Sequence, residues 1–188
     1  MKIVLTVIGK TQSKHLSEGI EMYTSRLKHY IPFELKVLPD IKNTRRLTEA
    51  QQKDIEGSAF LATIQPSDFV VLLDERGREY TSRQFSQFIE KNMNVLPHNL
   101  IFVVGGPYGF SQAMYDRAND KISLSRMTFS HEMVRLFFVE QIYRAMTIIK
   151  GEPYHHDWLT LTISDSVNNQ GENIGVKSQS NESFSITI

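Results

Sequence analysis

Residues 100–109 read LIFVVGGPYG, and the rest of the chain is organised around this stretch. Its apolar first half predicts a buried strand that stops at Gly105, because two glycines and a proline form a turn that no ordinary strand or helix absorbs. A second predicted strand, at residues 121–124, runs into a second loop at residues 125–129. Since open parallel sheets bind ligands at loops of this kind, the two loops together predict a ligand site.

The glycine pattern narrows the kind of ligand. Taken alone, it fits a plain tight turn as well as it fits a ligand loop. It matches neither the dinucleotide-binding pattern nor a phosphate-binding loop with its lysine. A ligand loop here would suit a molecule that needs close backbone approach without a phosphate, such as an adenosine joined to an amino acid.

A long helix is predicted from His131 to about Lys150, with Ser130 as its N-cap and with Gly151 and Pro153 as its stop signals. Apolar residues occupy more than one of its sides: Val134, Leu136, Phe137, Phe138, Val139, Ile142, Met146, Ile148 and Ile149. Such a helix is either central in the fold or packed against a partner subunit. In a chain of this size we favour a homodimer with twofold symmetry and with this helix in the interface.

Strand and helix patterns alternate before this stretch. Strands are predicted at residues 3–8, 33–38 and 69–73, and helices at residues 15–30, at residues 48–64 and from residue 81 onwards. Thr48 with Gln51, and Thr81 with Gln84, predict capping boxes. Residues 74–78 form a third loop at a strand end. The alternation predicts an α/β domain with a mainly parallel sheet covered by helices on both faces, and it leaves the strand order open.

Length and composition limit the classes of protein that fit. The 188 residues suit one domain, and the formal net charge of zero gives no strong steering toward nucleic acid. The absence of cysteine excludes disulfides, thiolate metal sites and cysteine nucleophiles. The apolar N-terminal run is too short for a signal peptide, and no segment approaches the ~20 apolar residues of a membrane span. We therefore expect a soluble, cytoplasmic protein with no membrane association.

Two local charge patterns have a structural and a functional interpretation. Lys42, Arg45 and Arg46 form a candidate RNA-facing edge, although a solvated loop explains any one of them more simply. Glu140 and Arg144 stand four residues apart on the long helix. Composition alone favours a surface ion pair for these two residues.

The composition changes after residue 156. Serine, asparagine, glutamine and glycine dominate residues 157–188, and their few apolar residues follow no sustained pattern. The sequence thus predicts a domain at residues 1–156 and an atypical polar tail at residues 157–188, mostly disordered from Ser164 onwards.

Four blocks carry a resemblance to a known family: VVGGPYG at residues 103–109, ISLSRMTFSH at 122–131, VR with EQIYRA at 134–135 and 140–145, and PYHH at 153–156. With these blocks in this order, residues 1–156 resemble the ribosomal large-subunit pseudouridine N3-methyltransferases of the SPOUT class, the RlmH family. The blocks are specific together and not singly. The resemblance implies a homodimeric α/β fold with a trefoil knot in its C-terminal half.

The resemblance also implies a cofactor and its site. The family binds S-adenosylmethionine between the loops of the knot. Matching positions place the cofactor-binding residues at the three strand-end loops described above: Leu73, Gly105, Leu124, Ser125, Arg126, Met127, Thr128 and Phe129.

The substrate that the resemblance implies is N3 of a pseudouridine in a stem-loop of large-subunit (23S) rRNA, within the assembled ribosome. This nitrogen is a weak imide acid, so a base or a cation is needed near it. Matching positions make Tyr154 and His155 catalytic candidates, with His156 where many relatives carry Lys or Arg, and Arg144 as an anchor for a phosphate or base oxygen. A zinc site built on the histidines is disfavoured because neither cysteine nor a suitably spaced carboxylate supports it, so we expect no metal.

One departure keeps another class of function open. Family members usually end within a residue or two of the position of His156, whereas this chain continues to Ile188. A tail could crowd the active site, which would leave a dimeric RNA-binding or interaction protein that has lost catalysis. A small-molecule methyltransferase is a weaker alternative, because no insertion that could form an extra pocket interrupts the pattern.

Overall fold

The computed structural model describes residues 1–41, 46–154, 162–163, 175–177 and 184–185. The chain forms two compact units, Met1–Tyr154 and His155–Ile188. The elements of the first unit are β1 (Ile3–Ile8), α1 (Lys14–Leu27), β2 (Phe33–Leu38), α2 (Glu49–Leu61), β3 (Phe69–Glu79), α3 (Ser82–Val95), β4 (Leu100–Val104), α4 (Gln112–Arg117), β5 (Asp120–Ser123) and α5 (His131–Ile149). In the second unit, β6 (Thr162–Ile163), β7 (Gly175–Lys177) and β8 (Phe184–Ser185) pair antiparallel.

The first unit is built on one sheet of five parallel strands in the order β2-β1-β4-β3-β5. β4 lies between β1 and β3, and all five of its residues are buried. Because every strand runs in the same direction, the loops that follow them meet at one edge of the sheet. This arrangement confirms the predicted α/β class and the parallel sheet, and it supplies the strand order that the sequence left open.

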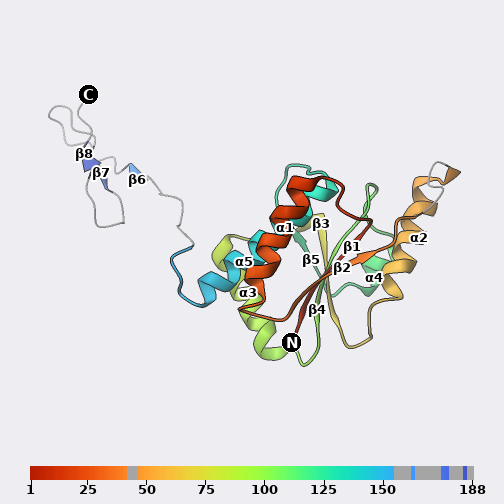
Figure 1. Cartoon of the computed structure of the whole chain (residues 1–188), viewed down its shortest axis with the longest axis horizontal. Coiled ribbons are helices and arrows are strands. Elements are labelled where there is room, and N and C mark those ends of the chain that lie inside the picture. The colour runs from red at the N-terminus through yellow and green to blue at the C-terminus, as the bar shows by residue number, and fades with distance from the viewer. Residues whose placement is uncertain (42–45, 155–161, 164–174, 178–183, 186–188) are drawn as a thin grey trace. The chain divides into compact units, whose positions relative to one another are not determined.

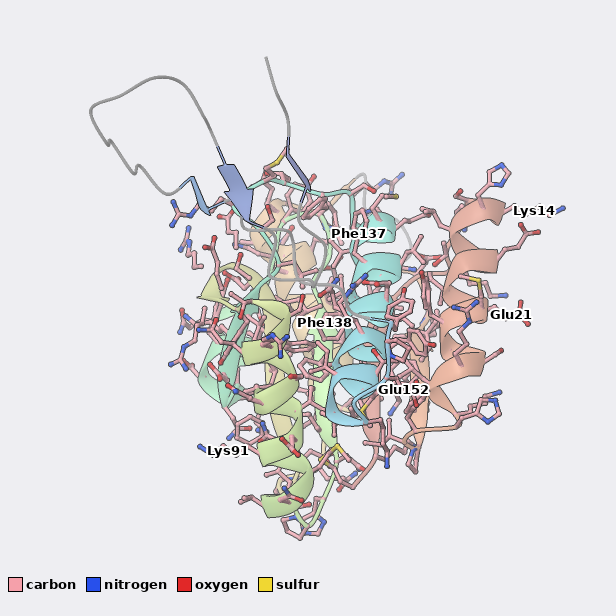
Figure 2. All side chains as sticks on the ribbon, turned by 90° about the vertical axis from the view of Figure 1, so that its left-hand side faces the viewer. Lys14, Glu21, Lys91, Phe137, Phe138 and Glu152 are labelled. Atoms are coloured by element: carbon pink, nitrogen blue, oxygen red, sulfur yellow. The ribbon has the colours of Figure 1, made fainter. Side chains whose placement is uncertain are left out.

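Helices cover both faces of the sheet (Figure 1). Alternate β1 residues such as Ile3 and Leu5 join a core cluster with α1, α3 and α5, while Val4 joins a second cluster with α2 and α4. Figure 2 looks onto the first face, where α5 lies between α3 and α1. The predicted two-sided apolar helix is therefore central in its layer, although Phe137 on α5 remains 40% exposed.

The largest difference from the prediction lies in β3. The expected loop at residues 74–78 belongs instead to a strand that continues to Glu79, and its pairing with β5 shifts register between Leu73 and Arg78. Gly77 permits this bulge, because a Cβ there would lie 2.5 Å from the backbone N and C of Ile122. The pairing depends on β5, far along the chain, so a local pattern could not predict it.

The predicted helix starts are confirmed, and some predicted helix ends are wrong. Thr48 and Thr81 form capping boxes, and Ser130 Oγ accepts a hydrogen bond from Met133 N. α1 and α2 end at Leu27 and Leu61, each three residues earlier than expected. Among the described residues, no helix combines the length and the apolarity needed to cross a bilayer.

Three predictions lie wholly or partly outside the described residues. Lys42 and Arg45 belong to residues 42–45, which the structure does not describe, whereas Arg46 is exposed just before α2. The disorder predicted for the tail concerns residues that are mostly outside the described part, and it stays a prediction. The trefoil knot also stays a prediction.

Candidate active site

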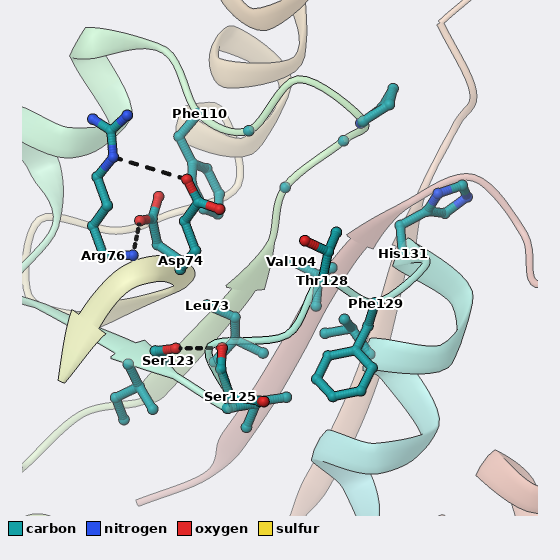
Figure 3. A pocket seen from close by; sticks show the side chains of 18 of the residues that line it. Leu73, Asp74, Arg76, Val104, Phe110, Ser123, Ser125, Thr128, Phe129 and His131 are labelled. Atoms are coloured by element: carbon teal, nitrogen blue, oxygen red, sulfur yellow. Dashed lines mark hydrogen bonds and ion pairs between the residues drawn. The ribbon is translucent and has the colours of Figure 1, made fainter. Parts of the chain in front are cut away.

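A cavity of about 680 Å³ opens at the edge of the sheet where β3, β4 and β5 end. Its lining includes every residue predicted to hold the cofactor: Leu73, Gly105, Leu124, Ser125, Arg126, Met127, Thr128 and Phe129. Figure 3 shows the cavity from close by, with Leu73, Val104 and Phe129 reaching it from three separate segments. The geometry thus brings together residues that the sequence placed on three loops.

The loop after β5 is shaped by its own side chains. Ser123 Oγ donates to the Ser125 carbonyl at 3.0 Å (Figure 3). Met127 N donates to Ser125 Oγ at 3.0 Å. Arg126 forms an ion pair with Glu79 at 3.2 Å, but its side chain is 90% exposed, so this pair contributes little. The serine hydroxyls therefore fix the turn that lines this side of the cavity.

The loop after β4 is a tight turn closed by a hydrogen bond from Gly109 N to Gly106 O at 3.1 Å. Gly109 has φ +81°, a left-handed conformation that glycine adopts without strain. A Cβ at Gly105 would lie 3.2 Å from both the Gly109 carbonyl oxygen and Phe110 Cζ. A side chain at Gly105 would therefore crowd the turn where it faces the cavity.

Asp74 is a lining residue that the sequence analysis did not single out. Its Oδ2 accepts a hydrogen bond from Tyr115 Oη at 2.5 Å, and its Oδ1 accepts one from Arg76 N at 2.8 Å. Burial raises the pKa of Tyr115 to about 12, and the hydrogen bond to Asp74 contributes in the same direction. Tyr115 thus stays protonated and holds the Asp74 carboxylate in place. In the sequence, Asp74 directly follows Leu73, which is a predicted cofactor-binding residue. That adjacency is the signal that could have identified Asp74.

The start of α5 is tied to the end of β1. Arg135 donates to the carbonyls of Ile8 at 2.6 Å and Gly9 at 2.7 Å, and only 2% of its surface is exposed. Glu132 accepts backbone hydrogen bonds from the start of α1, which lower its pKa. These contacts fix the end of α5 whose first residue, His131, lines the cavity.

Two of the predicted catalytic residues, Arg144 and Tyr154, lie together away from the cavity. Glu140 joins them: its Oε1 accepts from Arg144 Nη2 at 2.6 Å and from Tyr154 Oη at 3.1 Å. The Arg144 guanidinium lies 5.0 Å from the centre of the Tyr154 ring. The expected ion pair of Glu140 with Arg144 is thus present, but it is partly buried, with side chains 15% and 26% exposed. His155 and His156 lie outside the described residues.

This second cluster does not line the cavity of its own chain. Arg144 stands thirteen positions after His131 in α5, which corresponds to ~20 Å at 1.5 Å per helical residue. Tyr154 also donates to, or accepts from, Tyr23 of α1 at 3.4 Å. Burial, followed by the hydrogen bonds with Tyr23 and Glu140, raises the pKa of Tyr154 well above its usual range. The Tyr154 phenol therefore stays protonated near neutral pH.

No group of three or more His, Cys, Asp or Glu side chains within the described part of the chain could hold a metal ion.

The chain is similar to known methyltransferases. The family model described as "Predicted SPOUT methyltransferase" matches residues 1–155. A protein of Parabacteroides distasonis named ribosomal RNA large subunit methyltransferase H is 61% identical over 157 residues, which is 84% of this chain and 100% of that protein. Proteins of the same name from Christiangramia forsetii and Porphyromonas gingivalis are 58% and 57% identical, over 83% and 84% of this chain and 99% and 100% of theirs.

Proposed function

The chain belongs to the SPOUT methyltransferase family, and we propose that it transfers a methyl group from S-adenosylmethionine to N3 of a pseudouridine in a stem-loop of large-subunit (23S) rRNA. The observation that carries the proposal is the shared cavity, since all eight residues matched to the family's cofactor site line it. Relatives more than half identical over their whole length bear the name of rRNA large subunit methyltransferases. A ribosomal substrate would place the protein's work in the cytoplasm.

The cavity suits a nucleoside joined to an amino acid. Its volume of about 680 Å³ lies within the range of small-molecule sites. The loops after β4 and β5 present backbone groups to it, and Leu73, Val104 and Phe129 supply apolar surface for a ring. S-adenosylmethionine would supply an electrophilic methyl group when bound. Residues 105–109 and 124–129 would bind and orient this donor and exclude water from it.

The chemistry at the acceptor nitrogen requires removal of a proton. We propose His155 as the proton acceptor, with His156 beside it and Arg144 near the acceptor base or its phosphate. Tyr154 would serve as a hydrogen-bonding anchor rather than a base, because its raised pKa keeps the phenol protonated. Glu140 accepts hydrogen bonds from both Arg144 and Tyr154 and would thereby hold these two side chains in place.

The ~20 Å along α5 between the cavity and this cluster supports a homodimer with composite sites. In such a dimer, the cavity of one subunit would receive the residues at the C-terminal end of the partner's α5. Exposed apolar side chains near the cavity offer a surface for that partner: Phe137 is 40% exposed and Met127 is 74% exposed. Each active site is then incomplete in one chain alone.

Mixing two inactive variants tests the composite site. Gly105→Val should disable the donor half of a site and His155→Ala the acceptor half. After exchange of subunits, the mixture should recover about a quarter of wild-type activity, because half of the dimers are mixed and each carries one intact site. No recovery in mixtures that light scattering shows to be exchanged dimers would refute the composite site.

The decisive assay for the function is methyl transfer to ribosomes from a strain that lacks the modification, with the methylated nucleotide located by mass spectrometry. Turnover on whole ribosomes, isolated large subunits and a transcribed stem-loop should be compared at one salt concentration, because RNA affinity depends on salt. A chain with zero net charge gains little affinity for arbitrary RNA, so we expect transfer to whole ribosomes and little to the stem-loop. Binding to ribosomes without any methyl transfer would favour a protein that has lost catalysis.

A further inference from the structure

Glu56 is a buried carboxylate on α2, with only 3% of its surface exposed. Its Oε1 accepts a hydrogen bond from Gln52 Nε2 at 2.8 Å. Its Oε2 is also buried and has no hydrogen-bond partner among the described residues. A buried carboxylate oxygen without a donor is costly, so a folded protein that keeps one needs a reason for it.

The position of Glu56 explains the second glycine of the loop after β4. Gly106 does not have a positive φ, so its backbone conformation does not require glycine. A Cβ at Gly106 would overlap Glu56 Oε2 and lie 2.7 Å from the carboxyl carbon. The carboxylate therefore rests directly against the backbone of the loop, and glycine is needed there to make room for it.

The rest of α2 holds the carboxylate firmly in this place. A Cβ at Gly57 would overlap Ser111 Oγ, so α2 approaches the N-cap of α4 closely. Phe60, one turn after Glu56, is 1% exposed and belongs to the core cluster of Val103 and Phe110. Because α2 is packed against the segments on both sides of residues 105–109, Glu56 has little freedom to move away from the loop.

Glu56 does not itself line the cavity, although Lys53, one turn earlier on α2, does. Residues 105–109 separate the carboxylate from the cavity, so any effect of Glu56 on a ligand must pass through this loop. Pro107 has no N–H, and Gly109 N already donates to Gly106 O. Gly106 also pairs with Gly109 in an antiparallel bridge. Among residues 106–109, the loop can therefore offer Glu56 Oε2 the N–H of Tyr108 after a small shift.

We propose that Glu56 is a positioning residue for the methyl donor: when the donor binds, Glu56 Oε2 accepts a backbone N–H from residues 105–109 and fixes the loop around it. A hydrogen bond to a carboxylate is stronger than one between neutral groups. Because Oε2 has no partner in the part of the chain that the structure describes, the loop would gain this hydrogen bond in the donor-bound state. The inference rests on the proposed function, since it assumes that S-adenosylmethionine occupies this cavity.

The test compares Glu56→Leu and Glu56→Gln with wild-type protein. Calorimetry should show the Kd for S-adenosylmethionine rising at least about tenfold in Glu56→Leu, as expected for one lost hydrogen bond to a charged group. Glu56→Gln keeps a neutral acceptor and should recover part of the affinity. Hydrogen exchange should show residues 104–110 gaining protection with the donor in wild-type protein, less in the Gln variant and none in the Leu variant.

Asp68→Asn is the matched control, because Asp68 is a second buried carboxylate, 5% exposed, with both oxygens satisfied by Gln65 N and Asn99 Nδ2. It should lower the melting temperature and leave donor affinity unchanged. In Glu56→Leu donor affinity should fall while the melting temperature changes less than in Asp68→Asn, because removal of the unsatisfied Oε2 offsets the loss of the acceptor of Gln52 Nε2. A purely structural role for Glu56 would change the melting temperature and leave donor affinity unchanged.

Wild-type affinity and wild-type loop protection in folded Glu56→Leu would overturn the inference while leaving the proposed function intact. If Glu56→Leu does not fold, Glu56→Gln decides by the same two measurements, and unchanged values overturn the inference. Wild-type protein that neither binds the donor nor protects the loop would overturn the proposed function and this inference with it.

Discussion

Removal of the Tyr115 hydroxyl is the clearest test of how the cavity is held together. Tyr115→Phe deletes the hydrogen bond to Asp74 and leaves the ring against Phe110, with ring centres 6.0 Å apart. A hydrogen bond to a charged group contributes ~1.5–3 kcal/mol, and partial exposure of both groups reduces this value. We therefore expect the free energy of unfolding at pH 8 to fall by about 1–1.5 kcal/mol.

The pH dependence of this effect has a definite sign. The pKa of Tyr115 is raised from 10.0 to about 12, chiefly by burial. The contribution of the hydroxyl is therefore complete below pH 10 and is lost as the pH rises through 12. Urea unfolding between pH 8 and pH 11 should show the difference between wild-type protein and Tyr115→Phe shrinking above pH 10.

Tyr108→Phe is the control for this experiment, because it removes a hydroxyl from a ring of the same cavity that is 47% exposed. Its free energy of unfolding at pH 8 should stay within about 0.5 kcal/mol of wild type. A Tyr115→Phe variant as stable as wild type at pH 8, or a difference that does not change with pH, would refute the reasoning.

Substitutions at three further positions test other parts of the structure. Gly77→Ala should lower the free energy of unfolding by about 3 kcal/mol or more, because its Cβ would lie 2.5 Å from the Ile122 backbone; wild-type stability in thermal unfolding would contradict this. Glu132→Gln should make the melting temperature fall less steeply in acid. Backbone hydrogen bonds lower the pKa of Glu132 from 4.5, so the ionised side chain stabilises the fold above pH 4.5, and this stabilisation is lost as the pH falls further. A titration equal to that of wild type would count against this role. Gly105→Val should fold and lose binding of S-adenosylmethionine in calorimetry. Gly105→Ala, whose Cβ would lie 3.2 Å from Gly109 O and Phe110 Cζ, should bind it more weakly than wild type. Full affinity in the Val variant would remove Gly105 from the site.

The parts of the fold that follow local rules were predictable from sequence. β4 was predicted from a continuous apolar run, and α2 and α3 from Thr and Gln three positions apart, because these signals act within a few residues. The continuation of β3 beyond Leu73 was not predictable, since Arg78 and Glu79 pair with β5 residues more than forty positions later. Strand order likewise depends on which strands pair although they are distant in sequence, and the alternation of strands and helices along the chain does not determine it.

In the site, too, the residues marked by local signals were predictable and those that depend on distant partners were not. The loops at residues 105–109 and 125–129 were predicted because glycines and strand ends mark them, and the family resemblance named Gly105 and residues 124–129. Asp74 was missed because its partner, Tyr115, comes from another element. The sequence does carry a signal for Glu56: Gln52, Glu56 and Phe60 recur every four residues, which places two polar side chains on the core-facing side of α2.

The geometry of α5 suggests how the proposed dimer would bring its two halves together. His131 at one cavity and Arg144 at the distant cluster lie on opposite sides of Phe137, six and seven positions away. If a twofold axis passes close to Phe137, two α5 helices that cross antiparallel would place the partner's Arg144 end near the His131 end of the first chain. The Phe137 ring also contacts Phe129 of the loop after β5, with ring centres 5.3 Å apart. Contact between subunits at Phe137 would then act on Phe129, which lines the cavity, so that in this arrangement dimer formation and the proposed donor affinity depend on each other.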